Sequence, residues 1–331
     1  MSESNQLNSV IQLISRPEWQ IVRHLFKEMV RPAKTVLIQQ GVPSSGLIIL
    51  RSGALEVTKK IPGGDSLTIG VVQEGGHIGE VSLIDDQPSM VNVISLTPVH
   101  FIYLDRSYYK ALCTAFPEKN YHLMHILILK ALNKNKQYIE NIVSLLKRTP
   151  SLGVNYQSYE LAKSKLQQGY YYDHSDKITL NELQPFMHFT EDEGMILKSY
   201  AKPVYILGES YFDVSQQDSI FMLLEGAVQL KHVDEGIMLT FDTMTAGHIF
   251  AAERMIKLPL VSSCLHVREY AGFLSFDQGA LERLKKEHIH LYGKLFQVVS
   301  YSIIARLRNI SIHLIRIGSE GMGDTNFYID F

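Results

Sequence analysis

The chain has 331 residues, of which 46% are hydrophobic and 20% are charged, a composition that is typical of globular proteins and excludes a disordered chain. The formal net charge of −2 excludes the overall positive excess that is typical of proteins binding nucleic acid or anionic membranes. No apolar run reaches the roughly 18 residues that a membrane-spanning helix needs, and no secretory signal pattern opens the chain. Because Cys113 and Cys264 are the only cysteines, a disulfide framework is excluded and a cytoplasmic location is expected.

The first predicted elements are a short helix followed by many short strands. Ser15 to Glu18 resembles a capping box that opens the helix, and Pro32 is expected to end it. Glycines separate the β segments that follow. The expected strands cover residues 34–39, 47–50, 55–60, 67–72, 90–95 and 100–104. Many short strands between glycine turns predict a β-barrel or β-roll.

A long helix is predicted over residues 118–148, which contain neither proline nor glycine. Apolar residues recur in it at alternating steps of four and three, with one polar position. The stripe consists of Met124, Ile128, Ala131, Asn135, Tyr138, Ile142 and Leu145. Such a stripe packs either against its own domain or along a second helix, and the second arrangement would join repeats or two protomers of a homodimer.

The chain then repeats itself. Residues 48–57 (IILRSGALEV) resemble residues 221–230 (FMLLEGAVQL), and residues 76–88 (GHIGEVSLIDDQP) resemble residues 247–259 (GHIFAAERMIKLP). The second copy has its own capping-box pattern, Thr190 to Glu193, and its own apolar helix stripe. That stripe consists of Ile303, Leu307, Ile310, Leu314 and Ile317.

Two copies in the same order predict a mainly β protein with helices. The expected architecture is two tandem double-stranded β-rolls of jelly-roll type, each followed by a long α-helix. The expected domains are residues 1–148 and 181–318, with a linker at 149–180 and a tail at 319–331.

The most informative segment is Gly79-Glu80, which precedes a short apolar helix. Backbone N–H groups at the start of such a helix attract anions, whereas a carboxylate next to them is suited to accept hydrogen bonds from a sugar hydroxyl. This pairing of donor and acceptor groups predicts a ribose-phosphate ligand.

With the repeated β-rolls around it, this segment resembles the cyclic-nucleotide-binding domain family. Members include the regulatory subunit of cAMP-dependent protein kinase and catabolite activator protein. The family cassette is Phe-Gly-Glu, an apolar helical turn, then Pro-Arg and two small residues, and it corresponds here to residues 78–90. The resemblance implies that Glu80, which follows Gly79, binds the ribose 2′-hydroxyl. It also implies that backbone N–H groups near Val81, Ser82 and Met90 bind the cyclic phosphate, and that the long helix closes over the base.

Both copies depart from the family at the phosphate-binding arginine. Ser89 occupies that position in the first copy and Leu260 in the second. The matching Gly-His-Ile runs also place Phe250 at the cassette glycine, Ala251 at the glutamate and Ala252 after it. Losing one partner of a buried charge pair costs about 2–5 kcal/mol, or roughly 30-fold or more in affinity.

Three alternatives follow for the ligand. The first copy binds cAMP or cGMP weakly, with Ser89 and backbone donors in place of the arginine. In the second alternative, the first copy binds another ligand, such as the cyclic dinucleotide c-di-GMP. In the third, both copies are scaffolds that bind no ligand. The second copy is not expected to bind a cyclic mononucleotide, because its cassette features are lost and Phe250 fills the pocket.

No catalytic motif, cofactor fingerprint or metal-ligand spacing occurs, and His77 and His248 are expected to be structural. Neither long helix is followed by room for a DNA-binding domain, so nucleic-acid binding is not expected. The predicted function is a non-enzymatic regulatory protein. It senses a cyclic nucleotide through the first domain and relays the signal by helix rearrangement to an effector that the sequence does not name. The alternative is a ligand-independent adaptor that uses both β-rolls for protein contacts.

Overall fold

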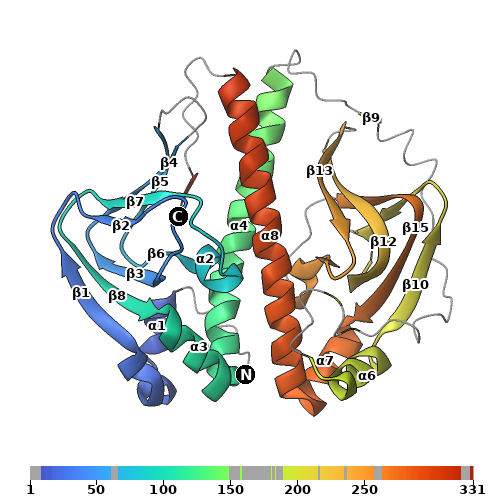
Figure 1. Ribbon diagram of the computed structural model, residues 1–331, viewed down its shortest axis with the longest axis horizontal. Coiled ribbons are helices and arrows are strands. Elements are labelled where there is room, and N and C mark those ends of the chain that lie inside the picture. Colours follow the sequence, from blue (N-terminus) through green and yellow to red (C-terminus); the bar gives the residue numbers. More distant parts are fainter. Residues whose placement is uncertain are drawn as a thin grey trace, which may run out of the picture. The chain divides into compact units, whose positions relative to one another are not determined.

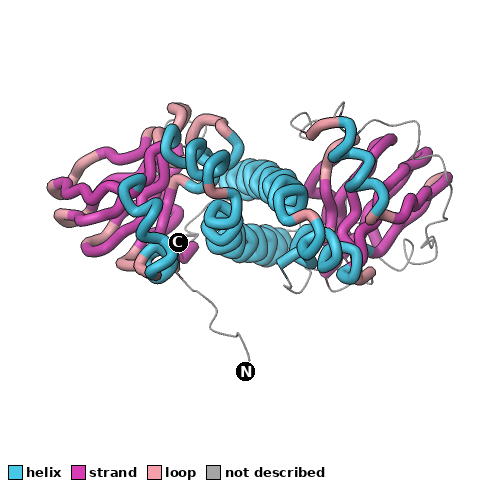
Figure 2. Tube along the Cα trace, turned by 90° about the horizontal axis from the view of Figure 1, so that it is seen from below, coloured by secondary structure: helices cyan, strands magenta, loops and turns pink. Residues whose placement is uncertain are grey.

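The computed structural model describes residues 9–60, 66–148, 157–158, 180, 183, 189–214, 217–234, 237–256, 263–321 and 329–330. The chain forms two compact units, Met1–Leu145 with Ser311–Phe331, and Leu146–Ile310. Each unit is a β-roll with helices along one side (Figure 1, Figure 2). The predicted architecture of two tandem β-rolls, each followed by a long helix, is confirmed. None of the helices in the described ranges is long and apolar enough to cross a membrane.

The first roll is built from two sheets with strand orders β1-β8-β3-β6 and β16-β5-β4-β7-β2. Its elements, in chain order, are α1 (Val10–Ile14), η1 (Pro17–Leu25), β1 (Phe26–Arg31), β2 (Val36–Ile38), β3 (Gly46–Ser52), β4 (Leu55–Lys60), β5 (Ser66–Val72), β6 (His77–Ile78), α2 (Glu80–Asp85), β7 (Asn92–Ser95), β8 (Val99–Asp105), α3 (Arg106–Ala115), α4 (Pro117–Arg148) and β16 (Ile329–Asp330). Strand pairs are antiparallel, except that β16 from the C-terminal tail pairs with β5 in parallel. Both sheets contribute to one apolar core, which includes Ile48, Leu50, Val57, Ile78, Val93 and Phe101.

The second roll has a seven-stranded sheet with the path β10-β15-β12-β13-β9, to which β11 and β14 are attached. Its elements are β9 (Gln157–Ser158), α6 (Glu191–Ser199), β10 (Lys202–Leu207), β11 (Ser210–Asp213), β12 (Ser219–Asp234), β13 (Ile237–Thr245), β14 (Ile249–Phe250), η6 (Ala252–Ile256), β15 (Ser263–Asp277), α7 (Gln278–Glu287) and α8 (Ile289–Gly321). The long strands β12 and β15 continue through positions that belong to separate strands in the first roll. Register shifts after Leu223 and Gly226 mark where this pairing changes.

The two predicted helix starts have different outcomes. The Thr190–Glu193 capping box is confirmed, because the Thr190 hydroxyl accepts from the Glu193 N–H and the Glu193 carboxylate accepts from the Thr190 N–H. The pattern at Ser15 to Glu18 is not a capping box, because no side chain caps η1. This helix also ends at Leu25 rather than at Pro32. The physical reason is that Phe26–Arg31 pairs with β8 and completes the first sheet.

The long helices α4 and α8 carry the predicted apolar stripes. Five stripe positions of α4 are buried, namely Met124, Ile128, Ala131, Tyr138 and Ile142. Ile303, Leu307 and Ile310 of α8 are buried too. The side chains of Asn135, Leu145, Leu314 and Ile317 lie outside the described part. So do Leu260 and almost all of the linker at 149–180, from which only Gln157–Ser158 and Leu180 are described.

A left-handed residue between β6 and α2 gives the cassette its shape. Gly79 has φ +100°, which allows the chain to pass from strand to helix within one residue. A Cβ atom on Gly79 would collide with the carbonyl oxygen of Gly46 in β3. By contrast, Gly41 also has a positive φ, +80°, but has nothing within 4 Å of its Cβ position.

We therefore expect Gly79→Ala to destabilise the first domain more than Gly41→Ala does. Gly41→Ala adds only backbone strain of about 1–2 kcal/mol, whereas Gly79→Ala adds a steric clash of about 1–3 kcal/mol to the same strain. Urea unfolding followed by the fluorescence of Trp19, the only tryptophan, measures both. Equal midpoints for the two variants would contradict the close approach of α2 to β3.

Candidate functional site

The turn at Gly79 directs the first side chain of α2 into the protein. Glu80 is 0% exposed, and its Oε1 lies 2.8 Å from Nζ of Lys134 on α4. Lys134 is itself only 4% exposed. Burial raises the pKa of Glu80, but the nearby Lys134 ammonium more than offsets this effect, so that the net pKa of the carboxyl is lowered. The result is a buried ion pair that joins the cassette to the long helix of the same unit.

Three further polar side chains surround this ion pair. His77 of β6 is fully buried, and burial lowers its pKa to about 3, so the ring is neutral. Burial and the charge of Lys134 lower the pKa of Lys130, one helical turn before Lys134. Burial and the charge of Glu80 raise the pKa of Tyr138, one turn after it. The site is therefore a cluster in which α4 contributes residues spaced by four.

The buried cluster is not saturated with hydrogen bonds. Both ring nitrogens of His77 and Oε2 of Glu80 have no hydrogen-bond partner within the described ranges. Buried polar atoms usually have partners, so each exception calls for an explanation, such as a bound water, an ion or a functional role. These atoms mark the interior of the cluster as a candidate binding site. The described residues include no group of three or more His, Cys, Asp or Glu side chains that could hold a metal ion.

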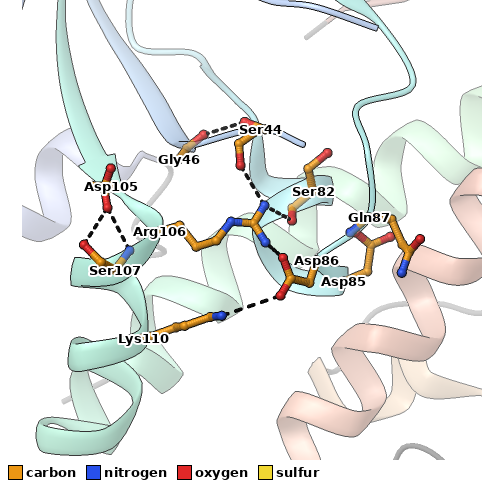
Figure 3. A network of polar contacts seen from close by, with 10 residues as sticks. All are labelled: Ser44, Gly46, Ser82, Asp85, Asp86, Gln87, Asp105, Arg106, Ser107 and Lys110. Carbon is orange, nitrogen blue, oxygen red and sulfur yellow. Dashed lines mark hydrogen bonds and ion pairs between the residues drawn. The ribbon is translucent and has the colours of Figure 1, made fainter. Parts of the chain in front are cut away.

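A second network of polar contacts connects α2 to the start of α3 (Figure 3). The Arg106 guanidinium at the start of α3 donates to the carbonyl oxygens of Ser44 and Ser82, at 2.7 and 2.9 Å. It also forms an ion pair with Asp86, to which Lys110 adds a second ion pair at 3.5 Å. Arg106 binds carbonyl groups and an exposed carboxylate, so this network positions α2.

The remaining residues expected to bind a ligand lie close to α2, but Ser89 is already engaged. Its hydroxyl donates to the Val91 carbonyl at 2.9 Å and accepts from the Val91 N–H at 3.2 Å. Its backbone N–H donates to the carbonyl of Val42. Val81 and Met90 are half-buried and Ser82 is buried. The expectation that Ser89 replaces the missing arginine is therefore not supported by its hydrogen bonds.

The cassette of the second roll follows a register that differs by one residue from the sequence match. Gly75 donates to the Leu50 carbonyl in the first roll, and Gly247 donates to the Leu223 carbonyl in the second. Gly247 is therefore the counterpart of Gly75 rather than of Gly76. The same spacing in sequence relates Asp105 to Asp277, the N-caps of α3 and α7.

This register corrects the predicted roles in the second cassette. Phe250 pairs with β12 as Ile78 pairs with β3, so it occupies a core position rather than the cassette glycine. It is completely buried in the apolar core against Phe273, and so it does not fill a ligand pocket. Ala251, with φ +54°, takes the place of Gly79, and Ala252 takes the place of Glu80.

The second roll also has a buried ion pair between its cassette and its long helix. Arg306 of α8 occupies the position equivalent to Lys134. Its Nη1 lies 3.1 Å from Oε1 of Glu253, and its Nη2 donates to the Ile249 carbonyl at 3.4 Å. Glu253 is one residue beyond Ala252, the counterpart of Glu80. Each roll thus has a cation at the same helix position and a carboxylate on its cassette.

Comparison with known proteins agrees with this arrangement. Residues 29–116 match the family model of the cyclic nucleotide-binding domain. The regulatory subunit of cAMP-dependent protein kinase from Aspergillus fumigatus is 32% identical over 81 residues, which cover 24% of this chain and 19% of that protein. Residues 29–116 carry a cyclic nucleotide-binding domain. The resemblance predicted from the cassette is confirmed, although the matched segment spans only about a fifth of its curated relative.

Solved structures similar to the chain include the cAMP-bound regulatory domain of protein kinase A from Toxoplasma gondii, at 15% identity over 84% of this chain and 86% of that chain, with a TM-score of 0.29. Another is the catabolite activator protein of Thermus thermophilus, at 22% identity over 46% and 78%, with a TM-score of 0.32. A third is the guanosine-bound regulatory subunit of a cAMP-independent protein kinase A from Trypanosoma cruzi, at 12% identity over 92% and 85%, with a TM-score of 0.31. At scores this low, the likeness adds nothing to the family match.

Sequence reasoning missed the helix residues of the candidate site. Lys130, Lys134 and Tyr138 recur every four residues on one face of α4, beside the apolar stripe. Two lysines bordering a buried stripe were a detectable signal. Their partner Glu80 lies far away in sequence, so the pairing itself required the fold.

The ion pair predicts strong coupling between Glu80 and Lys134. Either Glu80→Gln or Lys134→Met leaves a buried charge without its partner and is expected to cost about 3–5 kcal/mol of unfolding free energy. The double variant is expected to cost far less than the sum of both. Denaturant unfolding of the four proteins measures this coupling. Lys136→Met, which removes an exposed ion pair with Glu140, is the control and should cost about 0.5 kcal/mol or less. Additive effects at positions 80 and 134 would contradict the pairing.

The buried His77 predicts that stability is lost in mild acid. The unfolded chain takes up a proton on this residue below pH 6.5, whereas the folded protein resists protonation until about pH 3. Stability therefore falls as the pH decreases through this window, by at most about 1.4 kcal/mol per pH unit. His77→Ile, which installs the residue found at the equivalent Ile249, should flatten the dependence. Urea unfolding at pH 7 and pH 5 tests this, with His248→Gln at the half-buried His248 as control. A variant as acid-sensitive as the parent would refute a buried neutral His77.

Proposed function

We propose that the chain is a non-enzymatic regulatory protein that senses a cyclic nucleotide through its first domain, residues 1–148. The ligand binds at the cassette, which comprises Gly79, Glu80, Val81, Ser82, Ser89 and Met90. The observation that carries this proposal is the buried ion pair between Glu80 and Lys134. In the family, the glutamate at this position binds the ribose 2′-hydroxyl.

The ion pair gives a physical route from ligand to helix. Glu80 is completely buried, so a ribose hydroxyl reaches its carboxylate only if the contacts around it, which include the ion pair with Lys134, are rearranged. Lys134 belongs to α4, so the same event changes how α4 is held against the cassette. A ligand shifts such an equilibrium by its differential affinity for the two arrangements. This exchange is the helix rearrangement that relays the signal to an effector protein.

The second domain, residues 181–318, has no part in ligand binding under this proposal. Ala252 replaces the cassette glutamate, and Phe250 and Ala251 belong to the apolar core. The cation at position 306 is already bound by a carboxylate and a backbone carbonyl. The second β-roll is therefore available for contacts with other proteins.

The proposal also includes the location of the protein, its oligomeric state and the absence of enzymatic activity. A cytoplasmic location stays a prediction that rests on the chain having only two cysteines. A homodimer through the long helices stays a prediction. The absence of enzymatic activity is supported by the match to a regulatory subunit.

A second candidate function is a ligand-independent adaptor. One observation favours it, namely that Ser89 stands at the arginine position and already uses its donor groups within the chain. In that case the Glu80–Lys134 pair is permanent and both β-rolls present protein-binding surfaces.

Titration with cAMP, cGMP and c-di-GMP separates the two functions. Lys119, near the start of α4, lies 5.8 Å from the ring centroid of Trp19, so the fluorescence of Trp19 reports on this helix. We expect one nucleotide to release heat in calorimetry and to change this fluorescence. Silence towards all three nucleotides would favour the adaptor.

The role of Glu80 is tested by pairing a protein variant with a ligand variant. The parent should bind the ribonucleotide roughly tenfold or more tightly than its 2′-deoxy form, because a hydrogen bond to a charged group is lost. In Glu80→Gln this preference should shrink, whereas Glu140→Gln on the exposed face of α4 should keep it. An unchanged preference in Glu80→Gln would remove Glu80 from the site.

A further inference from the structure

The two rolls differ in the charge balance around their equivalent cations. In the second roll, one guanidinium, Arg306, faces one carboxylate, Glu253, at 3.1 Å. In the first roll, two ammonium groups, Lys130 and Lys134, act on the single carboxylate of Glu80. The neighbouring His77 is neutral and does not change this balance. Counted over the described residues of the two clusters, the first roll therefore has one more positive than negative charge beside its cassette, and the second has equal numbers.

The surplus charge belongs to a set of polar residues that only the first roll has. The counterpart of Lys130 is Ser302, that of His77 is Ile249 and that of Tyr138 is Ile310. All three counterparts are buried, with exposures of 4%, 0% and 1%. An apolar interior with a balanced ion pair needs no ligand. A polar interior with an uncompensated cation is stabilised by an anion.

The cation that the cassette lacks therefore has a replacement on the helix. Ser89 supplies neither a charge nor an unengaged donor. Lys134 is the charged donor that contacts the residue expected to bind the sugar, at 2.8 Å. Lys130 stands one turn away on the same face of α4 and is half-buried. An anion next to Glu80 would thus find an ammonium group within the cluster.

We propose that Lys134, supported by Lys130, is the phosphate-recognising cation of the first domain. This inference rests on the proposed function and names the residue that makes the site selective for an anion. On binding, a phosphate oxygen takes the place of Glu80 Oε1 at the Lys134 ammonium. Glu80 is then available to accept a hydrogen bond from the sugar hydroxyl. Both charged groups keep a partner throughout the exchange.

The charge count also selects the ligand class. The cluster has a surplus of one positive charge, and the phosphodiester of a cyclic mononucleotide has one negative charge. Binding such a ligand makes the cluster neutral, whereas a doubly charged 5′-monophosphate would leave a negative surplus. The ligand class is therefore a cyclic mononucleotide, and c-di-GMP with its two phosphates is a competing outcome of the titration.

The test compares each cyclic nucleotide with its neutral nucleoside, so that only the phosphate differs. Calorimetry is run with cAMP against adenosine and with cGMP against guanosine. Lys130→Gln is the first variant, because it neutralises the surplus charge and leaves the ion pair intact. Lys134→Gln is the second, and Lys134→Arg keeps the charge as Arg306 does. Lys136→Gln, on the exposed face of α4, is the matched control.

We expect the parent and Lys136→Gln to prefer the cyclic nucleotide over the nucleoside by at least about tenfold. Lys134→Gln should reduce this preference to near one, Lys130→Gln should reduce it several-fold, and Lys134→Arg should restore most of it. Circular dichroism verifies that each variant is folded. If Lys134→Gln does not fold, Lys130→Gln and Lys134→Arg decide the matter. An unchanged preference in the folded charge-neutralising variants would overturn the proposal.

A second measurement separates failure of this inference from failure of the proposed function. If the parent binds no cyclic nucleotide, melting temperatures are compared in phosphate and in chloride at equal ionic strength. A rise in phosphate for the parent and Lys136→Gln that is lost in Lys134→Gln or Lys130→Gln supports an anion site with another ligand. No rise in the parent, or an equal rise in all variants, overturns the anion site itself.

Discussion

A carboxylate that is completely buried needs a positive partner, and this requirement organises the first domain. Glu80 enters the interior because Gly79 turns the chain into α2 within one residue. Its partner, Lys134, comes from α4 rather than from the roll. The free energy of burying the carboxylate therefore depends on where α4 lies. Under the proposed function the same carboxylate accepts a hydrogen bond from a sugar hydroxyl, so ligand binding and helix position would depend on a single contact.

The second roll also has a buried ion pair between its long helix and its cassette, but it lacks a glutamate at the position of Glu80. The cation is at the equivalent helix position, whereas the carboxylate has moved one residue along the cassette, from the place of Glu80 to Glu253. One residue on a 3-10 helix such as η6 changes the direction of a side chain by about 120°. The longer, planar guanidinium of Arg306 spans that change, because it binds Glu253 and the Ile249 carbonyl through two of its nitrogens. The second roll thus keeps an ion pair between helix and cassette, although it lacks the glutamate expected to bind the sugar.

The sequence predicted the β-rolls, the long helices and Glu80, because glycine turns, strand alternation and the cassette are local patterns. It misplaced the second cassette by one residue, because the repeated Gly-His-Ile run aligns identical residues that occupy different positions in the two rolls. The backbone hydrogen bonds of Gly75 and Gly247 fix the equivalence of the strands instead. It also missed β1, whose place in the sheet depends on pairing with the distant β8. The partner of Glu80 was not predictable for the same reason, since no local rule selects one lysine on a helix that has several.

The two rolls differ in the charges and polar groups that surround the equivalent cations, Lys134 and Arg306. In the second, Ile249, Ala252, Ser302 and Ile310 surround a cation that already has its carboxylate and a carbonyl oxygen. Such an interior gains nothing from an anion, because binding one would create the uncompensated charge that burial penalises. Buried atoms without hydrogen-bond partners occur in the described parts of both rolls, at His77 and Glu80 in the first and at Glu253 and Arg306 in the second, but in the first a second ammonium group stands nearby. A ligand that supplies one negative charge and one hydroxyl donor completes this interior, which is the physical reason for assigning sensing to the first roll.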